Sequence, residues 1–330
     1  MTDLKLFAEI LSVDSTSGKE KELTELLKDR LEAPLMEAYP VGDGTENLLL
    51  SWGRPEVVFC THVDTVPPYI PPTFLEDGVL GRGSCDAKGQ IIALYSACKA
   101  LEAEGLSGFG LLLLTGEETG SFGARSFART PFRAKYLIVG EPTENRMVSA
   151  SKGTKSFDLV FEGEAFHSGY PQYGRSAVRM FQAFMNELDR AGFADDPVLG
   201  ETTWNVGLLR SDNPQNILSP RLECRIYFRT TFVTDRAVEA FMAVPREGVR
   251  VSARGGDAPA EYMTLPGFPS APASFGSDAP HLTNFTHKAI CGPGSIRHAH
   301  RADEQVMIAD LVAASEMYVK MFKQLINKES

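Results

Sequence analysis

The sequence is poor in features that would cross-link the chain or anchor it. It contains five cysteines among 330 residues, an odd number, and none of them forms a Cys-x-x-Cys pair. Three of the five lie inside apolar runs, so we expect no disulfide framework, and the pattern is typical of a reducing cytoplasm. The opening residues MTDLKLFAEILSV carry acids and lack the basic-then-apolar pattern of a secretory signal, which also favours a cytoplasmic location.

Two further absences limit the expected partners. No apolar run approaches the length of a membrane-spanning helix, and positive charge is not in excess, because the formal net charge is -10. We therefore expect neither nucleic acid nor a membrane as the main partner. The remaining composition, 43% hydrophobic and 23% charged, is typical of a globular protein, and the length suffices for one large or two ordinary domains.

Nucleotide-binding motifs are absent as well. The stretch GRGSCDAKG contains Gly-x-Gly, but Asp86 stands where a dinucleotide fingerprint needs its third glycine. A P-loop pattern does not occur either. This glycine-rich stretch therefore needs another explanation.

The first part of the chain alternates helices with apolar strands. Helical spacing of leucines follows a possible capping box, Ser17-x-x-Glu20, and a second helical pattern covers 88–105. Three short apolar runs predict strands buried on both faces, at 57–61, 109–115 and 136–140. This alternation predicts an α/β fold with a mostly parallel sheet flanked by helices.

The middle of the chain differs, because its predicted strands alternate polar and apolar residues. Strand patterns at 155–163, 202–209, 221–231 and 248–255 are interleaved with helical patterns at 175–192 and 235–243. The order β-α-β-β-α-β is that of a split βαβ, or ferredoxin-like, sandwich. We therefore expect an inserted domain at 154–254, a main domain made of 1–153 and 255–330, and a long final helix that begins near Asp303.

Side chains that bind metals follow the three buried strands. They are His62 and Asp64 after the first strand, Glu117 and Glu118 after the second and Glu141 after the third, with Asp86 just before a helix. Ligands of open parallel sheets bind outside the carboxyl ends of the strands, so we expect these side chains to converge. So many carboxylates need raised pKa values or bound cations, and carboxylates with histidine suit zinc, with cobalt or manganese as substitutes.

Each motif has an ordinary structural interpretation when it is taken alone. A His-x-Asp pair at the end of a strand is usually polar capping, and GEETG is usually a solvated turn. It is the convergence of four separate segments on one edge of a sheet that favours a metal site.

Seven motifs follow one another from residue 61 to residue 304: THVDTVP, GRGSCDAKG, GEETGSFGAR, GEPT, AFHSGYP, FGSD and GPGSIRHAHRADE. In this order the sequence resembles the dinuclear zinc family of aminoacylases, acetylornithine deacetylases, succinyl-diaminopimelate desuccinylases and carboxypeptidase G. The resemblance implies a zinc exopeptidase-like main domain and an inserted domain that serves as a lid and a dimerisation surface.

The resemblance also implies two zinc ions per chain. Their ligands would be His62 and Glu141 on one ion, Glu118 and His300 on the other, and Asp86 bridging both. His300 rather than His298 fits the family pattern Ala-His-x-x-Asp/Asn-Glu. Because the family has a cis peptide bond after its bridging aspartate, we expect one between Asp86 and Ala87.

Three further residues would support catalysis. Glu117 is the predicted general base, which takes a proton from the attacking water and passes it to the leaving amine. Asp64 would orient His62 from behind. By the resemblance, His167 of the inserted domain would reach into the active site of a partner subunit and hold the oxyanion, which predicts a homodimer.

Contacts with the substrate are predicted for four residues. They are Asn216, Arg229, Ser277 and Asp278. Arg229 fits the family arginine that grips a substrate carboxylate, although an exposed strand position explains it equally well.

The implied function is metal-dependent hydrolysis of the amide bond of a small N-acyl amino acid. Within the family, GPGSIRHAHRADE and the short chain look most like deacetylases of acetylornithine or acetyl-lysine in amino-acid biosynthesis. A dipeptidase or glutamate carboxypeptidase of the same family is the alternative. A metal-free binding protein on this scaffold is disfavoured, because all five ligands and Glu117 are present.

Overall fold

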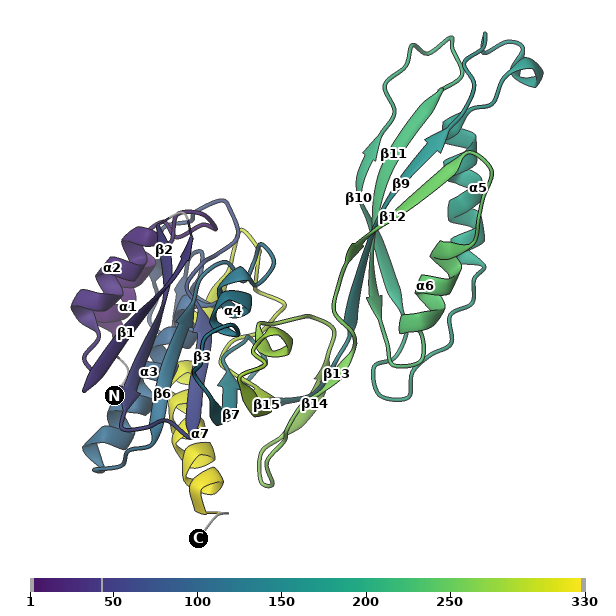
Figure 1. Cartoon of the computed structure of the whole chain (residues 1–330). Helices are drawn as coiled ribbons and strands as arrows, with labels where there is room; N and C mark the ends of the chain where they lie inside the picture. The colour runs from purple at the N-terminus through teal and green to yellow at the C-terminus, as the bar shows by residue number, and fades with distance from the viewer. Residues whose placement is uncertain (1–2, 43, 328–330) are drawn as a thin grey trace. The chain divides into compact units, whose positions relative to one another are not determined.

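The computed structural model describes residues 3–42 and 44–327 of the chain, and its contacts divide the chain into two units (Figure 1). The main unit comprises Met1–Ser149, Tyr262–Ala271 and Ser277–Ser330. The inserted unit comprises Ala150–Glu261 and Pro272–Gly276.

A six-stranded sheet forms the centre of the main unit, in the order β1-β2-β6-β3-β7-β15. These strands are Leu35–Gly42 (β1), Thr45–Trp52 (β2), Val57–His62 (β3), Phe109–Leu114 (β6), Ala134–Val139 (β7) and Phe285–Ile290 (β15). The pairs β6-β3, β3-β7 and β7-β15 are parallel, whereas β2 pairs antiparallel with both β1 and β6. The prediction of a mostly parallel central sheet is therefore confirmed.

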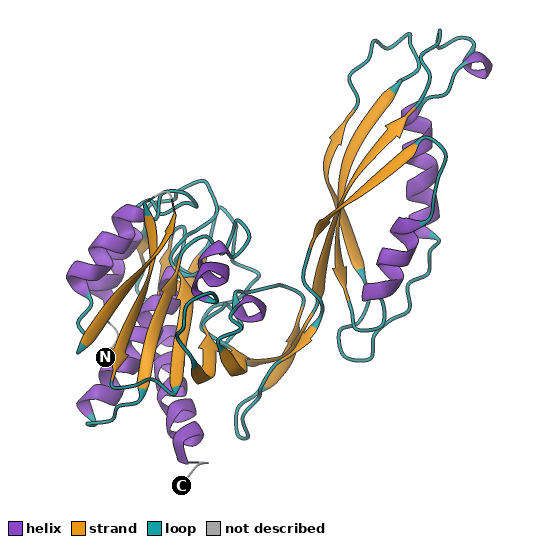
Figure 2. Cartoon of the chain, in the orientation of Figure 1, coloured by secondary structure: helices purple, strands orange, loops and turns teal. Residues whose placement is uncertain are grey.

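Helices pack on this sheet (Figure 2). They are Leu4–Leu11 (α1), Lys21–Arg30 (α2), Lys88–Ala103 (α3), Phe122–Phe127 (α4), Ile308–Asn327 (α7) and the 3₁₀ turn Ala279–His281 (η2). Helices α3 and α7 pack against each other, and α3 also contacts β3 and β6. Every residue of β3 and β6 is buried, which explains why these strands are apolar on both faces. The polar side chains of the predicted site accordingly stand at the carboxyl ends of these strands or beyond them.

The inserted unit contains a four-stranded antiparallel sheet, in the order β10-β11-β9-β12. Its elements are Gly153–Glu162 (β9), Pro171–Tyr173 (η1), Ala177–Asp189 (α5), Thr203–Arg210 (β10), Arg221–Thr230 (β11), Asp235–Ala243 (α6) and Val249–Gly255 (β12). Alternate residues of β11 are buried, and they pack under α5 and α6, which lie on the same face of the sheet (Figure 1). The order of strands and helices is β-α-β-β-α-β.

Two small three-stranded sheets complete the fold, in the orders β13-β8-β14 and β16-β5-β4. Their strands are Met147–Ser151 (β8), Ala260–Glu261 (β13), Ser270–Ala273 (β14), Thr73–Phe74 (β4), Gly78–Leu80 (β5) and Gln305–Met307 (β16). Strand β16 corrects the prediction for the final helix, which begins at Ile308 and not near Asp303. The residues just before Ile308 pair with β5 and are extended.

The predicted capping box is also wrong. Helix α2 begins at Lys21, and Ser17 does not cap it; its hydroxyl donates instead to Asp64 Oδ2 at 2.8 Å. Glu20 Oε2 accepts from the amide of Gly18. The local motif is therefore used to connect the N-terminal segment to a residue of the predicted site.

All five cysteines are buried and unpaired, as the sequence predicts. None of the helices in the described part of the chain combines the length and the apolar character needed to cross a membrane.

Candidate metal centre

Asp86 lies at the centre of the predicted ligands. It precedes helix α3 and is only 6% exposed. Its two carboxylate oxygens face different histidines: Oδ1 lies 3.1 Å from Nε2 of His62, and Oδ2 lies 3.3 Å from Nε2 of His300. The peptide bond between Asp86 and Ala87 is cis, as predicted. A carboxylate that faces one imidazole with each oxygen has the arrangement of a bridging ligand.

Two groups of three side chains share Asp86. We call His62, Asp86 and Glu141 the inner trio, and Asp86, Glu118 and His300 the outer trio. In each trio, one ligand atom per residue lies within 4.8 Å of the others. All residues of the inner trio are buried, whereas the His300 side chain is 49% exposed. The structure thus brings together all five residues that the sequence proposed as ligands.

The sheet explains the geometry of the inner trio. His62 is the last residue of β3, and Glu141 follows the neighbouring strand β7 by two residues. Strands β3 and β7 are paired in parallel, with Cys60 opposite Val139. Their carboxyl ends therefore reach the same edge of the sheet, as expected for a ligand site of an open parallel sheet.

The electrostatics of the cluster favour bound cations. Burial raises the pKa of the Glu141 and Glu117 carboxyls well above 4.5, and the negative charges of nearby acids raise it further. Burial disfavours charge on His62, but hydrogen bonds to Asp64 and Asp86 outweigh it and raise its pKa well above 6.5. Hydrogen bonds to Asp86 and Glu118 raise the pKa of His300 to about 10. The acids of this cluster thus draw positive charge to themselves.

The residues present fit two zinc-type ions. Each trio offers nitrogen and oxygen ligands in the number that catalytic zinc sites use. Moreover, Glu141 Oε1 is buried without a hydrogen-bond partner, although buried carboxylate oxygens are normally satisfied. A cation between Glu141, His62 and Asp86 would satisfy it.

Glu117 and Glu118 are adjacent, and both lie within the same 4.8 Å spacing of His62. Distance to His62 alone therefore does not separate their roles. The contact with His300 does, because Glu118 Oε1 lies 2.9 Å from His300 Nε2. This contact favours Glu118 as the ligand of the outer trio and leaves Glu117 beside it for proton transfer.

Asp64 lies behind His62, as predicted, and it contacts the ring with its main chain as well as its side chain. The closest partner of His62 Nδ1 is the main-chain carbonyl of Asp64, at 2.9 Å, whereas the Asp64 carboxylate is 3.4 Å away. That carboxylate instead accepts the amides of Glu117 (3.0 Å) and Glu118 (3.1 Å) and the hydroxyl of Ser17 (2.8 Å). Asp64 therefore fixes the ring of His62 with its backbone and the Glu117–Glu118 turn with its side chain.

The carbonyl of Asp64 also determines which nitrogen of His62 is free. A main-chain carbonyl can only accept a hydrogen bond, so Nδ1 carries the proton of the neutral ring. Nε2, which faces Asp86, is therefore the ring nitrogen of neutral His62 that could bind a metal.

Of the three predicted residues of the inserted unit, the structure brings His167 and Asn216 together. His167 and Asn216 are exposed and lie on neighbouring loops, because the amide of Ser168 donates to the carbonyl of Asn216 at 2.8 Å. The Nδ1 atom of His167 accepts from the amide of Gly169 at 3.1 Å. The neutral ring therefore carries its proton on Nε2, which is a potential donor. Arg229 lies on β11, with its guanidinium 5.0 Å from the ring centre of Tyr227.

Ser277 and Asp278 are both buried in the main unit. Burial raises the pKa of Asp278 to about 6, and His62 partly offsets this effect. The hydroxyl of Ser277 accepts from the amide of Ala279 at 3.2 Å. Neither side chain is open to solvent, so their contact with a substrate stays a prediction.

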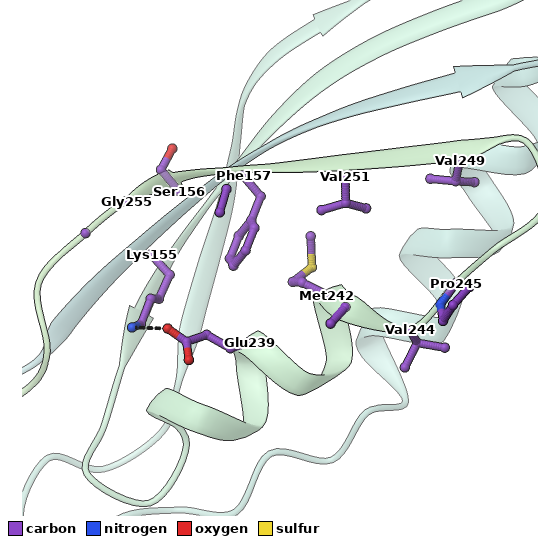
Figure 3. Close-up of a pocket in the computed structure, with 13 residues that line it drawn as sticks. Lys155, Ser156, Phe157, Glu239, Met242, Val244, Pro245, Val249, Val251 and Gly255 are labelled. Atoms are coloured by element: carbon purple, nitrogen blue, oxygen red, sulfur yellow. Dashed lines mark hydrogen bonds and ion pairs between the residues drawn. The ribbon is translucent and has the colours of Figure 1, made fainter.

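The predicted metal ligands and substrate contacts do not line the groove shown in Figure 3. This groove lies in the inserted unit beside α6 and β12 and has a volume of about 510 Å³. Its walls are mainly apolar, with Phe157, Met242 and Val251 among them, and an ion pair joins Lys155 to Glu239 at one end. None of the predicted ligand or substrate residues lines it.

The parallel sheet, the buried acids and the two histidines that face Asp86 together indicate a metal-dependent hydrolase. The chain belongs to peptidase family M20/M25/M40, whose model matches residues 58–324. It is 30% identical to a probable carboxypeptidase of Aspergillus oryzae, over 98% of this chain and 88% of that one. It is also 30% identical to a peptidase M20 domain-containing protein of Schizosaccharomyces pombe, over 96% of this chain and 83% of that one.

Solved structures share the fold at low sequence identity. A tripeptidase of Staphylococcus aureus matches with a TM-score of 0.80 at 17% identity, covering 96% of both chains. Human carnosine dipeptidase 1 matches with a TM-score of 0.68 at 14% identity, covering 96% of this chain and 94% of that one. The family model and the curated relatives confirm the family-level resemblance, and the protein is an enzyme. The narrower likeness to acetylornithine or acetyl-lysine deacetylases stays a prediction.

Proposed function

We propose that this enzyme hydrolyses the amide bond of a small substrate whose released amino acid carries a free carboxylate. Dipeptides, short peptides and N-acyl amino acids all fit this description. The observation that carries the proposal is the pair of trios joined through Asp86, with Glu117 directly beside them.

The inner and outer trios would hold two zinc ions. When bound, such ions lower the pKa of a water molecule and polarise the scissile carbonyl. Glu117 would accept a proton from the attacking water molecule as the oxygen of that molecule bonds to the carbonyl carbon. The same carboxyl then delivers the proton to the amine nitrogen as the C–N bond breaks. Asp64 keeps Glu117 in place by accepting its amide.

In this proposal, Arg229 and His167 of the inserted unit would contact the substrate. Among the described residues, Arg229 makes no ion pair with a carboxylate, and its guanidinium is only stacked near Tyr227. It is thus available for the carboxylate of a substrate, which a guanidinium binds with two parallel hydrogen bonds. His167, with its proton on Nε2, would donate to the oxyanion.

Peptides are the favoured substrates, because relatives and structural neighbours bear the names carboxypeptidase, tripeptidase and dipeptidase. Deacetylation of N-acetylornithine or N-acetyl-lysine is the second candidate, favoured by the motif GPGSIRHAHRADE. Both candidate reactions hydrolyse an amide bond, and they differ in the acyl group that is removed.

A substrate panel with the zinc-loaded enzyme tests the proposal. The panel contains simple dipeptides, N-acetylornithine, N-acetyl-lysine, N-acetylcitrulline and succinyl-diaminopimelate. Each is paired with the same compound carrying a C-terminal amide in place of the carboxylate, and Glu117→Gln serves as the inactive control. Turnover of carboxylates but not of amides is expected. Equal turnover of both members of each pair would refute the role of the carboxylate, and no turnover of any compound would refute the substrate class.

We further propose that the inserted unit forms a homodimer through strand β10. The two edges of its sheet differ. Strand β12 carries Arg250 and Arg254, which pair with acids of β9, and charges on an edge discourage pairing with another chain. Strand β10 instead exposes Leu208 by 44% and Leu209 by 56%. The apolar edge is the one that a second copy would cover.

Subunit mixing tests both the dimer and the role of His167 across it. An inactive Glu117→Gln chain is mixed with an inactive His167→Ala chain under conditions of subunit exchange. If His167 acts in the partner's site, a mixed dimer has one site with both defects and one intact site, and activity partly returns. Exchange without recovery, or an active monomer in light scattering, would contradict the proposal. Leu209→Lys should shift the enzyme toward the monomer, and the exposed Val244→Lys is the matched control.

A further inference from the structure

Glu304 is a buried acid that no motif assigned to the site. It is 1% exposed and stands four residues after His300 in the chain. One of its oxygens, Oε1, accepts three main-chain amides of the loop that leads to Asp86. These amides belong to Gly83 (2.9 Å), Cys85 (3.2 Å) and Asp86 itself (3.0 Å).

The second oxygen of Glu304 is also engaged. Oε2 pairs with the guanidinium of Arg82, which is itself buried. The main-chain carbonyl of Glu304 accepts the amide of Gly81 at 2.9 Å. One residue therefore holds the loop 81–86 along almost its whole length.

This arrangement connects the two trios. The loop 81–86 ends in Asp86, which both trios share, and the segment 300–304 begins with His300 of the outer trio. These segments are more than 200 residues apart in the chain, as the separation of Glu304 from the amides it binds shows. Gln90 also holds the loop, because its side-chain amide donates to the carbonyl of Cys85 at 3.0 Å.

We propose that Glu304 is a positioning residue that sets the distance between Asp86 and His300, and thereby the spacing of the two metal ions. The inference rests on the proposed function, because it needs metals at the trios. Removal of the acceptor would let Asp86 turn away from His300. The outer trio would lose more than the inner trio, because His62 and Glu141 are held by paired strands.

The test compares variants that differ in the acceptor oxygen. Glu304→Ala removes it, whereas the double variant Arg82→Met with Glu304→Gln keeps an acceptor at the same place and leaves no buried charge unpaired. Glu304→Asp keeps the charge but shortens the reach by one methylene. A matched control is Asp196→Ala in the inserted unit, because Asp196 is also buried and accepts three amides, those of Val198, Leu199 and Val233.

The readouts are the visible spectrum of the cobalt-loaded enzyme and the affinity for the second cobalt ion in a titration. We expect Glu304→Ala and Glu304→Asp to change the spectrum and to weaken the second ion roughly 10- to 100-fold, as for other residues that support ligands. The double variant and Asp196→Ala should keep the wild-type spectrum.

Three outcomes would overturn the inference. The first is a wild-type spectrum and a wild-type affinity for the second ion in Glu304→Asp. This variant keeps the buried negative charge beside Arg82, so it should fold even if Glu304→Ala does not. The second is a spectrum of the double variant that is as altered as that of Glu304→Ala. The third is an equal change in Asp196→Ala. A wild-type enzyme that binds no cobalt would instead refute the proposed metal centre itself.

Discussion

The inner and outer trios share one aspartate, yet the protein builds them differently. In the inner trio, His62 and Glu141 lie at the ends of paired strands and are buried. In the outer trio, Glu118 and His300 lie on loops, and His300 is half exposed. Under the proposed function, this difference would divide the work: the buried inner trio would fix a cation, and the more exposed outer trio would meet solvent and substrate.

The backbone supports this distinction. His300 has a φ of +63°, a value that only a few per cent of residues other than glycine adopt. Such conformations persist where surrounding contacts enforce them, and they cluster at functional sites. The backbone of His62, in contrast, belongs to a regular strand. The outer trio thus depends on loop contacts for its shape, and the inner trio depends on the sheet.

The change with the largest expected effect is Asp86→Asn, because it damages both trios at once. An amide offers one oxygen and cannot bridge two cations. Since a metal ion contributes several kcal/mol to the transition state, turnover should fall by about 10⁴-fold or more. Elemental analysis after zinc reconstitution should give fewer than two zinc ions per chain. The exposed Asp77→Asn is the control, and full zinc content in Asp86→Asn would contradict the shared ligand.

The next largest effect is expected from substitutions of the two neighbouring glutamates, which should have different consequences. Glu117→Gln should keep both metals and lose roughly 10²- to 10⁴-fold in kcat, because an amide cannot accept the proton of water. Glu118→Gln should lose the outer metal as well as activity. Zinc content and kcat measured on both variants decide the point. Near-normal kcat in Glu117→Gln would show that another group is the base.

Substitution of the two histidines tests the comparison directly. His300→Ala should leave the inner metal bound, whereas His62→Ala should weaken the inner metal, which lies in the buried trio. In the wild type, a chelator should remove the outer metal first, in a fast phase that is well separated from a slow one. Metal release followed with a zinc-sensitive dye checks this. A single phase for both ions would argue that the trios are equivalent.

The smallest effects are expected for residues that hold the candidate ligands in place without binding metal themselves. Asp64→Ala removes the acceptor of two amides and should lower metal affinity by about 10- to 100-fold. Ser17→Ala removes a single hydrogen bond to the Asp64 carboxylate and should cost less than about 10-fold. The measurement is a zinc titration against a competing chelator. Ser12→Ala, which affects only an exposed hydroxyl, is the control.

The sequence indicates that the candidate ligands converge, because three of the five stand just after or at the end of a buried strand. His62, Glu118 and Glu141 follow apolar runs, and parallel strands bring such ends together. The central sheet was equally visible, since β3 and β6 are uniformly apolar. Hairpin β1-β2 at the edge of the sheet was not identified.

Other features escape prediction because they depend on main-chain hydrogen bonds between distant segments. Glu304 ends a recognised motif and Arg82 stands within another, but nothing in either motif reveals that the two side chains meet. Ser17 is the opposite case, because here a local pattern predicts a contact that the structure does not form. Its spacing from Glu20 is that of a helix cap, but tertiary contact with Asp64 takes the hydroxyl instead. Local patterns cannot show such competition.

The burial of all five thiols makes each of them a reporter of opening. A thiol reagent in excess reaches a buried cysteine only when the surrounding structure opens, so the labelling rate measures the free energy of that opening. Cys224 lies in β11 of the inserted unit and Cys60 in β3 of the main unit. Labelling of variants that keep one of these thiols would therefore measure the two units separately. Since a cation stabilises the conformation that binds it, zinc should slow the labelling of Cys60 far more than that of Cys224.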